Sequence, residues 1–194
     1  MPPDLENFIR GGIVTKRPVP ISILREKDVR NYPYKVLREL MMNAVMHRDY
    51  QANMPTRLYQ YDHHIEIMNP GGLYGQTRPE NFPHVNDYRN SVVAEMLKNL
   101  NYVNMCNHGR REVQDLLKEN QSPIAEFNVN LVTAFSVIVR EPEDGDTANV
   151  GKDDPKDAPK NYLNVKELYW SSLQRIQLLQ LRPCRKRTAL MREQ

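Results

Sequence analysis

A stripe of three polar side chains on one predicted helix is the feature of the 194-residue chain that could most readily do chemistry. Glu39, Asn43 and His47 recur every four residues, so a helix places them on one face. The stripe suits a phosphate ligand, with Glu39 as general base, Asn43 as an oxygen ligand of Mg²⁺, and His47 or the adjacent Arg48 touching phosphate. The same spacing also fits a solvated helix face without a function.

A glycine turn is the second feature. Asn69, Pro70, Gly71 and Gly72 follow one another at the end of a predicted strand. Glycine has no side chain, so a ligand can approach the backbone closely at such a turn. The same four residues also form an ordinary turn, and the glycines by themselves do not distinguish the two.

The elements that must position these residues alternate between helical and extended patterns. The first helix covers 34–47, because its apolar residues recur at three and four residue intervals. The other predicted elements, in chain order, are edge strands at 13–14 and 21–24, a hairpin of strands at 57–61 and 65–67, helices at 91–100 and 110–119, and two strands within 127–139. This order predicts an α+β fold, a two-layer sandwich of helices on a mixed sheet, with a helical C-terminal appendage.

Charge and composition divide the chain into three parts. Residues 1–140 are predicted to form the folded domain, and 141–160 a flexible acidic linker, because the latter is rich in acids and proline. Residues 161–194 are predicted to form a helical basic tail. Its Arg185, Lys186 and Arg187 could contact DNA phosphates, or they could pair with acids of the linker or of a second copy.

Composition also excludes several classes of protein. No stretch approaches the roughly 20 apolar residues of a membrane span, and no secretory signal is visible at the start. The 2 cysteines form neither a disulfide framework nor a metal-binding spacing, so a reducing cytoplasm is expected. The net charge of +3 is too small to predict nucleic-acid binding by itself.

Read together and in this order, the motifs resemble a known family. The run from Glu39 to Tyr50, followed by the run from Ile65 to Leu73, is similar to the ATPase-like domain of RecG-like proteins, which are transcriptional regulators related to ATP-dependent DNA helicases. That domain is a divergent member of the superfamily of gyrase, chaperone and histidine-kinase ATPases with the Bergerat fold. The resemblance covers about residues 30–140 and includes Arg89-Asn90-Ser91 and Gly109.

The resemblance implies a site for ATP and Mg²⁺ between the first helix and the sheet. Glu39 would match the catalytic base, and Asn43 the Mg²⁺ ligand. Asn69, Gly71 and Gly72 would match the turn beside the adenine, where the superfamily has an aspartate instead of Asn69. Gly109 would match the end of the phosphate loop. DNA would be a partner through further domains or the basic tail.

Three functions remain open from the sequence. The first is a nucleotide-binding domain of a DNA-binding transcriptional regulator, with weak ATP hydrolysis at most. The second is a degenerate ATPase-like fold that serves as a dimerisation or interaction module, which is favoured by Asn107-His108-Gly109 where the family has a glycine-rich phosphate loop. The third is DNA binding by the basic tail alone, with strong salt dependence.

Other chemistries find little support in the sequence. No Gly-x-x-x-x-Gly-Lys-Ser/Thr run is present, so the chain lacks the phosphate-binding loop of a helicase motor. His63 and His64 are adjacent in a hairpin and point to opposite faces, which disfavours a shared metal ion. Cys106 has no base-orienting partner that would make it a nucleophile.

Overall fold

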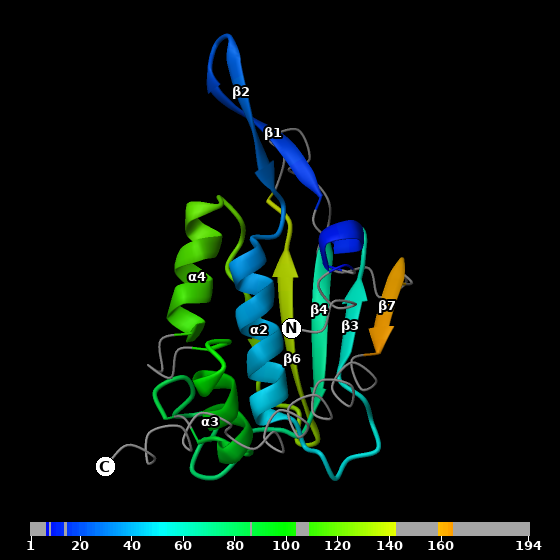
Figure 1. Cartoon of the computed structure of the whole chain (residues 1–194), viewed down its shortest axis with the longest axis vertical. Coiled ribbons are helices and arrows are strands. Elements are labelled where there is room, and N and C mark those ends of the chain that lie inside the picture. The colour runs from blue at the N-terminus through cyan, green and yellow to red at the C-terminus, as the bar shows by residue number, and fades with distance from the viewer. Residues whose placement is uncertain are drawn as a thin grey trace, which may run out of the picture.

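A computed structural model describes residues 7, 9–13, 15–85, 87–103, 109–142 and 159–164. Helices α2, α3 and α4 lie over one face of a five-stranded sheet, which makes the two layers of an α+β fold (Figure 1). The predicted α+β class is therefore confirmed. The sequence predicted a mixed sheet, but in the part of the chain that the structure describes all ladders between neighbouring strands of this sheet are antiparallel.

Helix α2 (Tyr34–His47) is the centre of the helical layer, and its bounds agree with the predicted ones. Eight of its residues are buried, in agreement with the apolar spacing that predicted the helix. Pro33 precedes the helix, and its carbonyl oxygen accepts hydrogen bonds from the backbone of Val36 and Leu37. Helices α3 (Ser91–Asn99) and α4 (Gly109–Glu119) lie on the same side of α2 in Figure 1, with α3 near the end of α2.

The sheet has the strand order β5-β6-β4-β3-β7. Strands β3 (Arg57–Gln60) and β4 (His64–Pro70) form the predicted hairpin, and β5 (Glu126–Asn128) and β6 (Ala134–Arg140) the second one. Ile65 and Ile67 of β4 pair with Val139 and Val137 of β6, and all four side chains are buried. This apolar face of the sheet packs against the buried side of α2.

The last strand corrects the predicted start of the tail. Residues 161–164, predicted as the beginning of a helical segment, form β7 (Asn161–Asn164) and pair with β3 along its whole length. An unpaired edge of β3 offers backbone hydrogen bonds that a local sequence pattern does not reveal. The remaining residues of the predicted tail, 165–194, and most of the predicted linker lie outside the described residues.

The N-terminal region also differs from the prediction. Residues 13–14 and 21–24 were predicted to add strands to the edge of the sheet. Instead, β1 (Lys16–Ser22) pairs only with β2 (Arg25–Arg30), and this separate hairpin extends beyond the two layers (Figure 1). The π-helix η1 (Ile9–Ile13) precedes it and buries both of its terminal isoleucines in the core.

Candidate functional site

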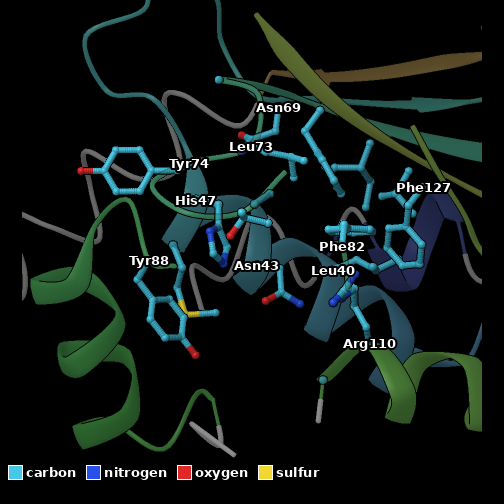
Figure 2. A pocket seen from close by; sticks show the side chains of 18 of the residues that line it. Leu40, Asn43, His47, Asn69, Leu73, Tyr74, Phe82, Tyr88, Arg110 and Phe127 are labelled. Atoms are coloured by element: carbon cyan, nitrogen blue, oxygen red, sulfur yellow. The ribbon is translucent and has the colours of Figure 1, made fainter. Parts of the chain in front are cut away.

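One cavity brings the polar stripe of α2 together with the glycine turn. Glu39, Asn43 and His47 all line it, and so do Asn69, Gly71, Gly72 and Gly109. The cavity lies between α2, the ends of β4 and β6, and the loops on either side of α3 (Figure 2). Its volume is about 1080 Å³ including the open mouth, which is large enough for a nucleotide.

Glu39 is a half-buried carboxyl group in this cavity. Burial raises the pKa of Glu39, and the hydrogen bond from Asn43 Nδ2 to Glu39 Oε1, 3.3 Å long, partly opposes this increase in pKa. A carboxyl with a raised pKa can accept a proton near neutral pH more readily than an exposed one. The general-base role of Glu39 stays a prediction, and its carboxyl group lies in the cavity where such a role would be exercised.

Asn43 presents an oxygen to the cavity. Because its Nδ2 donates to Glu39, the remaining polar atom of the side chain is Oδ1. An amide oxygen is a ligand type that Mg²⁺ accepts, usually together with water and phosphate oxygens. Among the described residues, no group of three or more His, Cys, Asp and Glu side chains could hold a metal ion. A Mg²⁺ ion at Asn43 would therefore depend on ligand oxygens from the phosphates and from water.

His47 is a neutral imidazole. Burial, followed by the charges of Arg110 and Arg89, lowers the pKa of His47 to about 4. The ring stacks on that of Tyr88, with 5.4 Å between ring centres and 22° between planes. His47 can therefore form a hydrogen bond to a ligand at neutral pH, but it cannot contribute a positive charge.

Arg48 does not lie in the cavity, and its predicted contact with phosphate is wrong. Helix α2 ends at His47, and the chain turns so that the Arg48 side chain is buried against the start of β3. Its Nη1 donates to Thr56 Oγ1 at 3.1 Å, and its Nη2 to the carbonyl oxygen of Met54 at 2.9 Å. These bonds direct the guanidinium away from the ligand space.

The glycine turn is shaped by close neighbours. Gly71 has a φ of +95°, a conformation that residues with a side chain rarely adopt. A Cβ atom on Gly72 would lie 2.6 Å from the carbonyl oxygen of Val132, so only glycine fits between this turn and the loop before β6. The turn therefore stays against the sheet and leaves its other side open to the cavity.

Arg89 and Asn90 hold the turn and the end of α2 in place. Arg89 Nη2 donates to the carbonyl oxygen of Gly72 at 3.2 Å, and its guanidinium stacks on the ring of Tyr74. Asn90 Nδ2 donates to the carbonyl oxygens of Met46 and Arg48 at 3.0 and 2.7 Å. The Arg-Asn-Ser motif thus supports the site without lining the cavity.

Arg110 is the cation of the cavity, and the sequence analysis missed it. It follows Gly109 at the start of α4, and its guanidinium lies 3.8 Å from the centre of the Phe82 ring. Its Nη2 donates to the carbonyl oxygen of Pro83 at 2.6 Å. Burial lowers the pKa of Arg110 to about 10, so the side chain keeps its charge at neutral pH.

Gly109 brings α4 close to Glu39. A Cβ atom on Gly109 would overlap Glu39 Oε1, so the glycine allows the first turn of α4 to approach the carboxyl group. The preceding residues Cys106, Asn107 and His108 lie outside the described residues, as do Arg185, Lys186 and Arg187 of the tail. The loop that joins the glycine turn to α3 supplies lining residues that no sequence periodicity indicated: Leu73, Tyr74, Thr77, Phe82, Asp87 and Tyr88.

Comparisons with known proteins agree with this fold. The model of the family described as "Putative ATP-dependent DNA helicase recG C-terminal" matches residues 54–139. The solved structure of the DIP2311 protein from Corynebacterium diphtheriae has a similar fold, with a TM-score of 0.58 and 19% sequence identity. The match covers 72% of this chain and 28% of that one. No curated protein matches the sequence.

The family match includes the glycine turn and Gly109 but begins after α2. Glu39, Asn43 and His47 therefore join the site by geometry alone, as residues of the same cavity. Among the described residues, no helix is long and apolar enough to cross a membrane. The family model thus matches residues 54–139 and agrees with the RecG-like ATPase-like domain that the motifs of the sequence predicted.

Proposed function

We propose that the cavity beside α2 binds a nucleoside triphosphate together with Mg²⁺, and ATP is the nucleotide that the family resemblance implies. The observation that carries the proposal is the convergence of a candidate general base, an amide oxygen, a glycine turn and a partly buried cation on one cavity. These groups come from separate parts of the chain. A nucleotide needs all of them: an apolar space for the base, and charge and oxygen ligands for the phosphates.

Each group has a place in this proposal. Arg110, with the backbone at the start of α4, would face the phosphates, since a cation and a helix N-terminus both favour anions. Asn43 Oδ1 would be a ligand of the Mg²⁺ that neutralises the phosphates. Glu39 would accept a proton from the attacking water if hydrolysis occurs.

The wider role follows from the family. We place this nucleotide site in a cytoplasmic DNA-binding transcriptional regulator, with DNA contacted by further domains or by Arg185, Lys186 and Arg187. In such a protein nucleotide binding would bias the arrangement of the DNA-binding parts. A helicase activity is not part of the proposal, because the sequence has no phosphate-binding loop of a motor.

A second candidate is an interaction module that has lost nucleotide binding. The contacts of Arg110 favour it, because its guanidinium is already hydrogen-bonded to Pro83 and stacked on Phe82 without any phosphate. Such a module would keep the fold as a surface for a second copy or another protein.

Isothermal titration with nucleoside triphosphates and Mg²⁺ separates the two candidates. We expect binding to the full chain, and we expect Arg110→Gln to weaken it about tenfold or more through loss of a charge-assisted contact. Arg111→Gln is the matched control, because Arg111 is the next residue, is exposed and does not line the cavity. No heat of binding with any nucleotide would leave the interaction module as the function.

A further inference from the structure

The tip of the hairpin formed by β1 and β2 exposes apolar side chains to solvent. Ile23 is fully exposed, Leu24 is 92% exposed and Ile21 is 59% exposed. The three residues lie at or beside the turn that joins the two strands, at the end of the hairpin that extends beyond the two layers (Figure 1). Single exposed apolar residues are common on protein surfaces, but three together at a protruding tip are typical of an interaction site.

The charges of this hairpin are divided between its two faces. Directly opposite residues of an antiparallel pair share a face, and successive residues of a strand point to opposite faces. The register puts both acids on one face, together with two prolines and two basic residues: Lys16, Pro18, Pro20, Glu26, Asp28 and Arg30. The other face has three cations and two valines but no acid: Arg17, Val19, Arg25, Lys27 and Val29. This second face is called the basic face below.

Two cations of the basic face are available to a partner. Arg25 and Lys27 are exposed, and within the described part of the chain neither takes part in an ion pair or a side-chain hydrogen bond. Arg17 is different, because its Nη2 donates to the carbonyl oxygen of Asn120 at 2.7 Å and anchors the base of the hairpin to the body. The two available cations therefore lie between this anchor and the apolar tip.

The prolines of β1 limit how a partner can bind. Proline has no N–H group, and within a paired strand it is tolerated only where that group would face away from the neighbouring strand. Pro18 and Pro20 therefore remove two hydrogen-bond donors from the outer edge of β1. A protein strand cannot add to this edge with a regular ladder. The tip and the basic face are left as the contact surface.

The partner that fits this surface is an anion that is contacted from one side and accepts an apolar wedge. Duplex DNA has both properties, because its phosphates attract Lys and Arg and its grooves admit a two-stranded ribbon or an apolar side chain between base steps. An anionic membrane would surround an inserted tip and would bring lipid phosphates against Glu26 and Asp28 as well. The one-sided charge of the hairpin therefore favours DNA.

We propose that the hairpin of β1 and β2 binds duplex DNA through its basic face and its tip. Arg25 and Lys27 contact phosphates, and Ile23 and Leu24 enter a groove. Phosphate contacts do not read the base sequence, and the affinity that they provide falls steeply with salt. This inference rests on the DNA-binding part of the proposed function and is independent of nucleotide binding in the cavity.

The cations are tested by titrating a fluorescently labelled DNA duplex of mixed sequence with the full chain at several salt concentrations. The double variant Arg25→Gln, Lys27→Gln is expected to bind about tenfold more weakly at low salt, and the slope of log affinity against log salt should decrease by about 2. Lys98→Gln, Arg111→Gln is the matched control, because it removes two exposed charges from α3 and α4. An equal loss of affinity in both double variants overturns the inference.

The tip is tested by the double variant Ile23→Ser, Leu24→Ser, which changes only exposed side chains and should leave the stability unaltered. We expect it to weaken DNA binding several-fold without a change in the salt slope, because no phosphate contact is lost. The same variant is tested on vesicles of phosphatidylcholine and phosphatidylserine. Binding to these vesicles that depends on the tip, without binding to DNA, overturns the inference in favour of a membrane partner.

The other outcomes separate this inference from the proposed function. If DNA binding is unchanged in the hairpin variants and lost when residues 185–187 are replaced by glutamine, the tail is the contact. The inference is then overturned while the DNA-binding role stands. If the full chain does not bind the duplex even at low salt, both are overturned. Nucleotide binding is measured in a separate titration, so its absence does not alter the result for the hairpin.

Discussion

Asn90 Nδ2 lies 2.7 Å from the carbonyl oxygen of Arg48, and this bond joins the start of α3 to the end of α2. The same nitrogen also donates to Met46, so one side chain satisfies two carbonyl oxygens that the ended helix leaves without intrahelical partners. We expect Asn90→Ala to lower the free energy of unfolding by about 1–3 kcal/mol. Urea denaturation measures the change, and Asn99→Ala at the exposed end of α3 should have little effect.

Gly72→Ala should destabilise the fold, because its Cβ atom would meet two backbone carbonyl oxygens at 2.6 and 2.8 Å. Backbone atoms cannot move aside as a flexible side chain can, so we expect a loss of about 1–3 kcal/mol in the free energy of unfolding. Gly11→Ala is the control, since a Cβ atom there would meet nothing within 4 Å. Thermal denaturation compares the two variants, and an equal decrease in melting temperature in both would contradict the packing described for the turn.

His47 should make stability depend on pH. Its pKa is lowered to about 4 in the folded protein by burial and by nearby arginines, so the unfolded chain binds the proton more strongly. The contribution of His47 to stability is therefore present above the unfolded pKa of about 6.5 and is lost as pH falls towards 4, by up to about 3 kcal/mol.

Denaturation curves between pH 7 and pH 4 test this sign. In His47→Gln the change in stability over this range should be smaller than in the unaltered chain, whatever the absolute stability of the variant. His63→Gln, at an exposed turn, should retain the full change. If His47→Gln also retains it, the imidazole is protonated as easily in the folded state as in the unfolded one.

Asn43→Ala should weaken nucleotide binding more with Mg²⁺ than without it. In the proposed site the substitution would remove one oxygen ligand of the ion, and it also removes a hydrogen bond to Glu39 that is independent of the metal. Titrations with Mg²⁺ and with a chelator separate the two effects. An equal loss of affinity in both conditions would mean that Asn43 positions Glu39 and does not bind the metal.

The main body of the fold could be predicted from the sequence because its patterns are local. The apolar spacing within Tyr34–His47 is a property of one helix, and the alternation in β3 and β4 is a property of one hairpin. The convergence of the α2 stripe with Asn69 followed from the family resemblance, which supplies the tertiary arrangement that spacing alone does not.

The remaining features depend on contacts distant in sequence. Ile21 to Leu24 suggested a strand of the main sheet, yet the partner strand β2 has mostly charged residues and provides no apolar face to pack. Arg48 follows His47 directly, but the end of the helix turns it towards Thr56. The sequence indicated Arg110 only weakly, through its position directly after Gly109. Its contacts with Phe82 and Pro83 come from a loop that has no periodic pattern, so the sequence did not predict them.

Helix α4 has a mechanical consequence for the molecule, because it joins the cavity to the hairpin of β1 and β2. Arg110 lies in its first turn, while Asn120, just beyond its last, accepts from Arg17 of β1 and donates to the carbonyl oxygen of Arg30 of β2. An α-helix of 11 residues is a stiff rod of roughly 16 Å. One stiff element therefore links the hydrogen bonds to both strands of the hairpin with the placement of Arg110 in the cavity.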